Sequence, residues 1–234
     1  MAHRQYADEL ALSIMVDTAC YNQGLLHREV DRRNFVGKRD DVGFTLLLKG
    51  LGGFEATNAG EFGGLFGDGA SAFLLSARPA DAKSLAYRLG DFFFGCATKY
   101  AEAIAVSDAG GGKLEVQFDG DALSRAAISR MEKVIDEVEH RSGISRDTVG
   151  AFATHQPNPR LVTLLAKQLG VSVKYFPPIV ATRGNLGSSM CGAALHDALH
   201  HAAAQPADQR KPVFLASLGP GLLFGGGWMV PAGT

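Results

Sequence analysis

The sequence "VGAFATHQPNPRLVTLLAKQLG" (residues 149–170) has the pattern of a buried strand, a polar turn and an amphipathic helix in direct succession, which is typical of an α/β fold. The turn from His155 to Arg160 holds a histidine, two amides, two prolines and an arginine. A strand-to-helix turn needs only a capping residue and one proline. This turn therefore carries more hydrogen-bonding groups than its geometry requires, which makes it the first place to look for a functional site.

Strands and helices alternate on both sides of this stretch. The sequence predicts strands over 10–16, 42–50, 70–76, 149–155, 212–219 and 222–230, and helices over 20–33, 121–142, 159–170 and 184–202. Residues 173–181 are expected to be a short extended segment, and residues 84–118 are assigned no more than one or two strands and a loop. Alternation of this kind indicates an α/β layered domain whose central strands are covered on both faces.

Two of the predicted helices are amphipathic. In the helix from residue 121, Gly143 lies just beyond the end, and the apolar residues recur at Leu123, Ala127, Met131, Ile135 and Val138. In the helix over 159–170, the predicted apolar face consists of Leu161, Leu164, Leu165 and Leu169.

Composition and charge narrow the class of protein. The 234 residues are 46% hydrophobic and contain 29 glycines, enough for a sizeable core in a soluble globular protein. The net charge of -1 argues against a nucleic-acid or membrane-surface protein. The 3 cysteines are too few for a disulfide framework, and we find neither a signal peptide nor a membrane-spanning run. A cytoplasmic location is expected.

Three residues carry the candidate chemistry. His155 ends one strand, and Asn185 precedes a helix in the turn "TRGNLGSS"; in layered α/β folds such positions converge on one edge of the sheet. An imidazole beside a carboxamide supplies two neutral donors, which suits an oxyanion or an enolate. Cys20 begins a helix, where the thiolate is favoured. The alternatives are a turn histidine, a capping asparagine and a small core cysteine.

Four sequence blocks resemble one family. They are "LFGDGASAFLL" (65–75), "HQPNPRLVTLLAKQLG" (155–170), "RGNLGSSMCGAALHDAL" (183–199) and "LGPGLLFGGGWM" (218–229). In order and spacing they resemble the β-ketoacyl-ACP synthase III family of the thiolase-like superfamily. The resemblance implies an N-terminally truncated thiolase-like layered fold (α-β-α-β-α). In that fold, residues 1–110 would be the remainder of the N-terminal half and 111–234 the C-terminal half.

The resemblance also assigns roles to individual residues. "HQPN" is similar to the family motif "HQAN", which makes His155 the catalytic histidine, with Asn185 as its asparagine partner. Cys20 is placed as the acyl-accepting nucleophile, although "ACYNQG" is only partly similar to the usual surroundings. Asn158 and Arg160 match positions near the pantetheine tunnel mouth, where they would bind substrate; the alternative is a helix cap and a solvated arginine.

The implied activity is that of an acyltransferase in fatty acid or polyketide biosynthesis. Acyl-CoA and acyl carrier protein would be the partners, no metal or redox cofactor is needed, and we expect a homodimer or a heteromer with another thiolase-like chain. Two alternatives stay open. One is acyl transfer to an oxygen or nitrogen nucleophile, and the other is a non-catalytic subunit of a thiolase-like complex.

Two departures from the family pattern qualify these expectations. The strands and helices that the family places before its nucleophile have no room ahead of Cys20. The chain is therefore expected to be a fragment, to have a misplaced start, or to need a partner chain that supplies the missing layer. Pro220 in "LGPG" replaces a residue whose N–H helps to form the oxyanion hole, and proline has no such donor. Type III polyketide synthases carry a similar "GPG".

Overall fold

The computed structural model of the chain describes residues 43–49, 70–76, 87–110, 113–219 and 222–232. The strand predicted over 10–16, the helix over 20–33, Cys20 and Pro220 lie outside the described residues.

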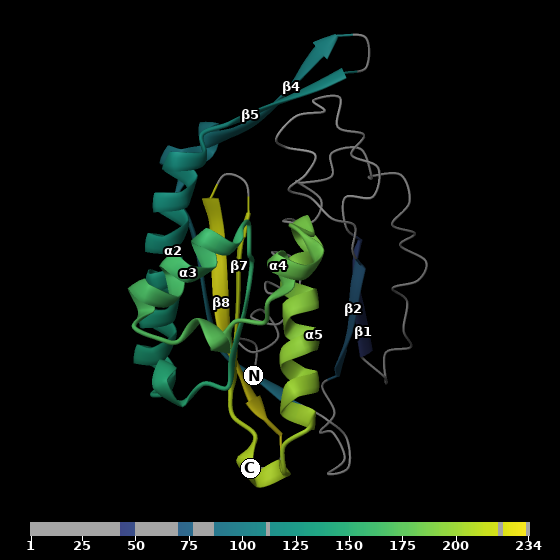
Figure 1. Ribbon diagram of the computed structural model, residues 1–234, viewed down its shortest axis with the longest axis vertical. Helices are drawn as coiled ribbons and strands as arrows, with labels where there is room; N and C mark the ends of the chain where they lie inside the picture. The colour runs from purple at the N-terminus through teal and green to yellow at the C-terminus, as the bar shows by residue number, and fades with distance from the viewer. Residues whose placement is uncertain (1–42, 50–69, 77–86, 111–112, 220–221, 233–234) are drawn as a thin grey trace, which may run out of the picture.

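The described residues form both strands and helices, which Figure 1 shows. The strands are β1 (Gly43–Lys49), β2 (Ala70–Ser76), β3 (Tyr87–Cys96), β4 (Ile104–Gly110), β5 (Lys113–Phe118), β6 (Ala151–Thr154), β7 (Val213–Gly219) and β8 (Leu223–Pro231). The α-helices are α2 (Gly120–Ser142), α3 (Pro159–Leu169), α4 (Ile179–Arg183) and α5 (Met190–Ala203). The short 3-10 turns are η3 (Thr98–Ala103), η4 (Arg146–Thr148), η5 (Val173–Tyr175), η6 (Gly187–Ser189) and η7 (Ala207–Gln209).

The central sheet has the strand order β3-β8-β7-β6. β6 and β7 are parallel, whereas β7–β8 and β3–β8 are antiparallel. β1–β2 and β4–β5 form separate antiparallel pairs. Because β3 precedes residue 111 and pairs with β8, the sheet takes strands from both sides of the predicted boundary, and the division into two halves stays a prediction.

The sheet is covered on both faces, and its side chains alternate accordingly. Phe152 and Phe214 point into one core with α2 and α3, whereas Ala153 and Leu215 point into a second core with α5. Beyond α5 lies the β1–β2 pair (Figure 1). The described layers thus follow the order α-β-α-β, which corresponds to consecutive layers of the predicted α-β-α-β-α arrangement.

Helix α2 forms where the periodicity predicts it. Asp119 caps its start by accepting a hydrogen bond from the backbone N–H of Ala122 at 2.9 Å, and Gly143 ends it with a φ of 71°. Its buried stripe is Ala126, Met131, Val134, Ile135 and Val138, so three of the predicted positions are fully buried, while Leu123 and Ala127 are partly buried.

Gly226 in β8 lets this helix lie directly on the sheet. A Cβ atom at Gly226 would come within 2.7 Å of the Ala216 Cβ and 2.9 Å of a Val134 methyl carbon. Neither distance is tolerated between real side chains, so only glycine fits between α2 and β7. At Gly225 and Gly227 the space is filled by the rings of Phe94 and Phe92, respectively.

Three predictions about secondary structure are wrong. Residues 87–118 contain three strands, β3, β4 and β5, rather than one or two. Residues 173–181 are not extended, since they form η5 and most of α4. The predicted helix over 184–202 begins as an α-helix only at Met190, after the 3-10 turn η6.

The apolar face predicted for α3 is also partly wrong. Leu165 and Leu169 are buried as expected, but Leu164 is 39% exposed and Val162 is buried instead. The buried stripe is Val162, Leu165, Ala166 and Leu169. It is rotated from the predicted face because α3 packs against both α2 and the sheet.

Candidate active site

His155 directly follows the last residue of β6. Its backbone N–H donates to the Ala216 carbonyl at 3.2 Å, which continues the pairing of β6 with β7 by one residue. The side chain is partly buried, and desolvation lowers the pKa of His155 to about 4. The imidazole is therefore neutral at pH 7 and can donate one N–H hydrogen bond.

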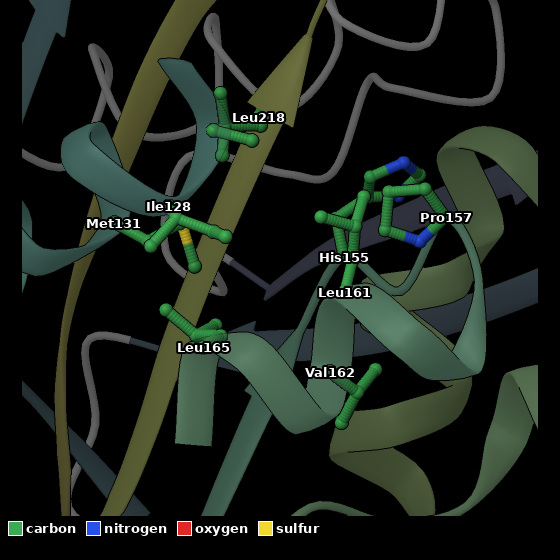
Figure 2. A pocket seen from close by; sticks show the side chains of 9 residues that line it. Ile128, Met131, His155, Pro157, Leu161, Val162, Leu165 and Leu218 are labelled. Carbon is green, nitrogen blue, oxygen red and sulfur yellow. The ribbon is translucent and has the colours of Figure 1, made fainter. Parts of the chain in front are cut away.

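The His155 side chain borders a small apolar cavity between α2, α3 and the end of β7 (Figure 2). The cavity has a volume of about 40 Å³. It is lined by Ala127, Ile128, Met131, His155, Pro157, Leu161, Val162, Leu165 and Leu218. His155 is the only titratable member of this lining, so the cavity brings an apolar wall and one polar group together.

Gln156 is fully buried, with an exposed fraction of 0%. Its Nε2 donates to the Pro177 carbonyl at 2.7 Å, and its Oε1 accepts from the backbone N–H of Val180 at 3.2 Å. Both ends of the amide are thus bonded to backbone groups at the start of α4. Because α4 leads directly to Asn185, Gln156 ties the loop that carries His155 to the segment that carries Asn185.

No role for Gln156 was predicted from the sequence. The available signal was the surplus of hydrogen-bonding groups in the turn after β6, since a glutamine between a buried strand and a proline has to satisfy its amide within the fold. Which backbone groups it would meet depends on a segment far along the chain.

Asn185 lies between Gly184, with a φ of 75°, and Gly187, with a φ of 57°. Its Oδ1 accepts from the backbone N–H of Gly187 at 2.9 Å, and its side chain is partly buried. This bond fixes the orientation of the amide, because the oxygen has to face the N–H donor. The Asn185 amide nitrogen is then the end turned away from the backbone turn. Asn185 is not part of the lining of the cavity beside His155.

Asn158 and Arg160 begin α3. Asn158 caps the helix by accepting a hydrogen bond from the backbone N–H of Leu161 at 2.9 Å, and Pro159 takes the first helical position. Arg160 is exposed in the first turn. These contacts are those of a helix cap and a solvated arginine, while substrate binding by either residue stays a prediction.

The described cysteines differ in their surroundings. Cys191, at the start of α5, is buried, and its thiol donates to the Ala216 carbonyl at 3.3 Å, the same oxygen that accepts from the His155 backbone. Burial raises the pKa of Cys191 to about 11. This thiol remains protonated at neutral pH and is unsuited to accept an acyl group. Cys96 is exposed at the end of β3.

The comparison with known families agrees with this geometry. Residues 140–230, which include His155, Gln156 and Asn185, match the family model "3-Oxoacyl-[acyl-carrier-protein (ACP)] synthase III C terminal". The predicted resemblance is thereby confirmed. The "HQPN" and "GN" motifs both lie within the matched residues, while the roles assigned to His155 and Asn185 stay predictions.

Curated relatives extend the match toward the N-terminus. The β-ketoacyl-ACP synthase III of Thermosynechococcus vestitus is 28% identical over 171 residues, covering 69% of this chain and 50% of the relative. That of Neorickettsia sennetsu is 33% identical over 107 residues, covering 46% of this chain and 31% of the relative. The chain spans about half the length of the first of these relatives.

Solved structures show the same fold. The 3-oxoacyl-(acyl carrier protein) synthase III of Pseudomonas aeruginosa superimposes with a TM-score of 0.59 at 24% identity, covering 73% of this chain and 51% of that chain. The 1,3,6,8-tetrahydroxynaphthalene synthase of Streptomyces coelicolor, a type III polyketide synthase, gives a TM-score of 0.60 at 19% identity, with coverages of 73% and 47%. The predicted thiolase-like fold is confirmed.

In the part of the chain that the structure describes, no helix has the length and apolar character needed to cross a membrane.

Proposed function

We propose that the chain is a condensing acyltransferase similar to β-ketoacyl-ACP synthase III. Cys20 takes an acyl group from acyl-CoA: its thiolate attacks the thioester carbonyl, a new carbon–sulfur bond forms, the bond to the CoA sulfur breaks, and CoA leaves as its thiolate. A malonyl thioester then loses CO₂ to give an enolate. The enolate carbon attacks the Cys20 thioester carbonyl, which forms the carbon–carbon bond, breaks the carbon–sulfur bond and releases the Cys20 thiolate.

His155 and Asn185 would stabilise the enolate oxygen in the second half-reaction. Each contributes an N–H donor, from a neutral imidazole and from a carboxamide. The observation that carries the proposal is the environment of His155, at a strand end beside an apolar cavity, with burial that lowers its pKa to about 4. A histidine that stays neutral at pH 7 can act as a fixed donor throughout the reaction.

The same environment argues against acyl transfer to an oxygen or nitrogen nucleophile with His155 as the general base. A general base is most effective when its pKa lies near the operating pH. The pKa of His155 lies well below that range, which makes the imidazole a weak proton acceptor. Condensation therefore fits the site better than base-catalysed transfer.

The partners follow from the chemistry of the proposed substrates. The acyl donor would be acyl-CoA and the malonyl group would be carried by acyl carrier protein. Arg160, exposed at the start of α3, offers a cation to a phosphopantetheine arm or to an acidic carrier surface. A homodimer, or a heteromer with another thiolase-like chain, and a cytoplasmic location complete the proposal.

The test is the intact mass of the purified chain after incubation with a panel of acyl-CoAs. Wild type should gain one acyl group, Cys20→Ala should gain none, and the matched control Cys96→Ser should gain one. A malonyl thioester labelled in its free carboxyl group then distinguishes the reactions, because only condensation releases labelled CO₂. An adduct without CO₂ release would favour transfer to another nucleophile. A folded sample that forms no adduct would favour a non-catalytic subunit.

A further inference from the structure

Helix α5 carries a histidine pair that the proposed reaction does not use. His196 and His200 are four residues apart on one helix, and their ring centroids lie 4.2 Å from each other. Both residues are exposed, and the side chain of His196 is 62% accessible.

Asp197 holds one of these imidazoles in place. Its Oδ1 lies 3.3 Å from Nδ1 of His196, and its Oδ2 lies 3.7 Å from a guanidinium nitrogen of Arg183. A carboxylate at Nδ1 selects the tautomer that carries the proton there, which leaves Nε2 as the free electron-pair donor. Imidazoles that bind metals are commonly oriented by such a carboxylate.

We propose that His196 and His200 bind one divalent late first-row transition metal ion, of the class of Zn²⁺, Ni²⁺ and Cu²⁺. Imidazole nitrogen is a preferred ligand of these ions, and two histidines four residues apart on one helix face are the arrangement by which helices bind zinc. The negative end of the helix dipole, at the C-terminus of α5, also favours a bound cation.

The site has two protein ligands, with water completing the coordination. Among the described residues no group of three or more His, Cys, Asp and Glu side chains could hold a metal ion. Both oxygens of Asp197 already face other groups, so this carboxylate positions His196 rather than binding the metal. Such a site is open and exchanges its ion readily, unlike a closed structural zinc site.

The experiment is a calorimetric titration of the tag-free chain with ZnCl₂ under reducing conditions. Wild type should bind one zinc ion at this site. His196→Ala and His200→Ala should each weaken binding more than tenfold, and Asp197→Asn about tenfold, as expected for loss of an orienting carboxylate. The matched control is His201→Ala, an exposed histidine next to the pair, which should leave the affinity unchanged.

A second readout does not depend on stoichiometry. Zn²⁺ should raise the melting temperature of wild type and of His201→Ala but not that of the double variant His196→Ala/His200→Ala. Mg²⁺, which prefers oxygen ligands, should have no such effect on any variant. Zinc binding by the double variant with wild-type affinity, or equal weakening by His201→Ala, would overturn the proposal. The result is independent of acyl transfer, because none of these residues belongs to the proposed active site.

Discussion

The chain places histidines in two contrasting environments, the end of β6 and the exposed side of α5. His155 borders an apolar cavity, is partly buried and has a pKa lowered to about 4. His196 and His200 are exposed on a helix, with their ring centroids 4.2 Å apart and their ring planes tilted by 47°. The imidazole is thus a neutral hydrogen-bond donor at His155 and a solvent-exposed metal ligand at His196 and His200.

The difference lies in what surrounds each ring rather than in the ring itself. At the end of β6 the cavity wall disfavours the charged imidazolium, so desolvation fixes the protonation state. At the end of α5 a carboxylate orients one ring and water reaches both. Variants at the two sites should therefore fail in different assays.

The largest expected effect is on catalysis. His155→Ala should lower the rate of malonyl-dependent CO₂ release by about 10²-fold or more, because one donor to the enolate is lost. His200→Ala should leave this rate unchanged. The measurement is single-turnover CO₂ release from the acylated chain, with circular dichroism to confirm that both variants are folded. A wild-type rate for His155→Ala would contradict the assignment of His155.

The next effect is on the pH dependence of stability. In the unfolded chain His155 takes up a proton below its ordinary pKa of 6.5, whereas in the folded chain it does so only near 4. Between these values the unfolded state binds more protons, so the free energy of unfolding falls as the pH is lowered from 6.5 to 4. The loss should be about 2 to 3 kcal/mol. Urea titrations at several pH values across this range measure the free energy of unfolding. This free energy should change less with pH in His155→Gln than in wild type, and as much as in wild type in His196→Ala.

A smaller effect is expected at the glutamine beside His155. Gln156→Leu leaves the Pro177 carbonyl and the Val180 N–H without their partner, which should lower the free energy of unfolding by about 1 to 3 kcal/mol. Gln168 bonds to Glu132 at 2.9 Å on the exposed side of the fold. The matched change Gln168→Leu should therefore cost less than about 0.5 kcal/mol. If chemical denaturation gives the same loss in the free energy of unfolding for both variants, the buried hydrogen bonds of Gln156 stabilise the fold no more than the exposed one of Gln168.

The smallest effect is at the cap of α3. Asn158→Ala removes the acceptor for the Leu161 N–H and should cost about 1 kcal/mol, while Asn158→Asp keeps an acceptor and should cost less. Thermal unfolding measures both. If Asn158 also binds substrate, Asn158→Asp should raise the KM for the malonyl substrate while leaving stability near that of wild type. An unchanged KM would leave Asn158 with the capping role alone.

The helices and strands that were predicted correctly are those whose own residues show a clear hydrophobic periodicity and clear end signals. Helix α2 is long, strongly periodic and bounded by Asp119 and Gly143, so its place and most of its buried stripe could be predicted. Strands β1 and β2 were placed within a residue of their observed ends. The face of α3 was less certain, because leucine recurs on two sides of that helix and only its neighbours decide that Leu164 stays exposed.

The errors arise where distant contacts override local preference. Pro177 and Pro178 made residues 173–181 look extended, since proline disfavours helix in the residue before it. In the structure Pro178 precedes a short helix instead, and the first-turn N–H of Val180 is satisfied by Gln156 from another part of the chain. No local signal contains that contact.

The candidate active site was also predicted only in part, because some of its contacts join segments that are far apart in the sequence. The motifs placed His155 and Asn185 at a strand end and before a helix, and the structure has them there. The roles of Cys20, His155, Asn185, Asn158 and Arg160 remain predictions, and Cys20 lies outside the described residues. The motifs did not indicate that Gln156 joins the segments carrying His155 and Asn185, because its partners are backbone groups, which have no sequence signature.

The Gln156 bond to Val180 has a consequence for hydrogen exchange. Amide protons in the first turn of a five-residue helix normally exchange with deuterium as fast as those of a loop, since they have no acceptor within the helix. The Val180 amide is an exception, because its acceptor is a fully buried side chain. Its exchange rate therefore reports how often the His155 loop and the Asn185 segment separate, in the absence of any substrate.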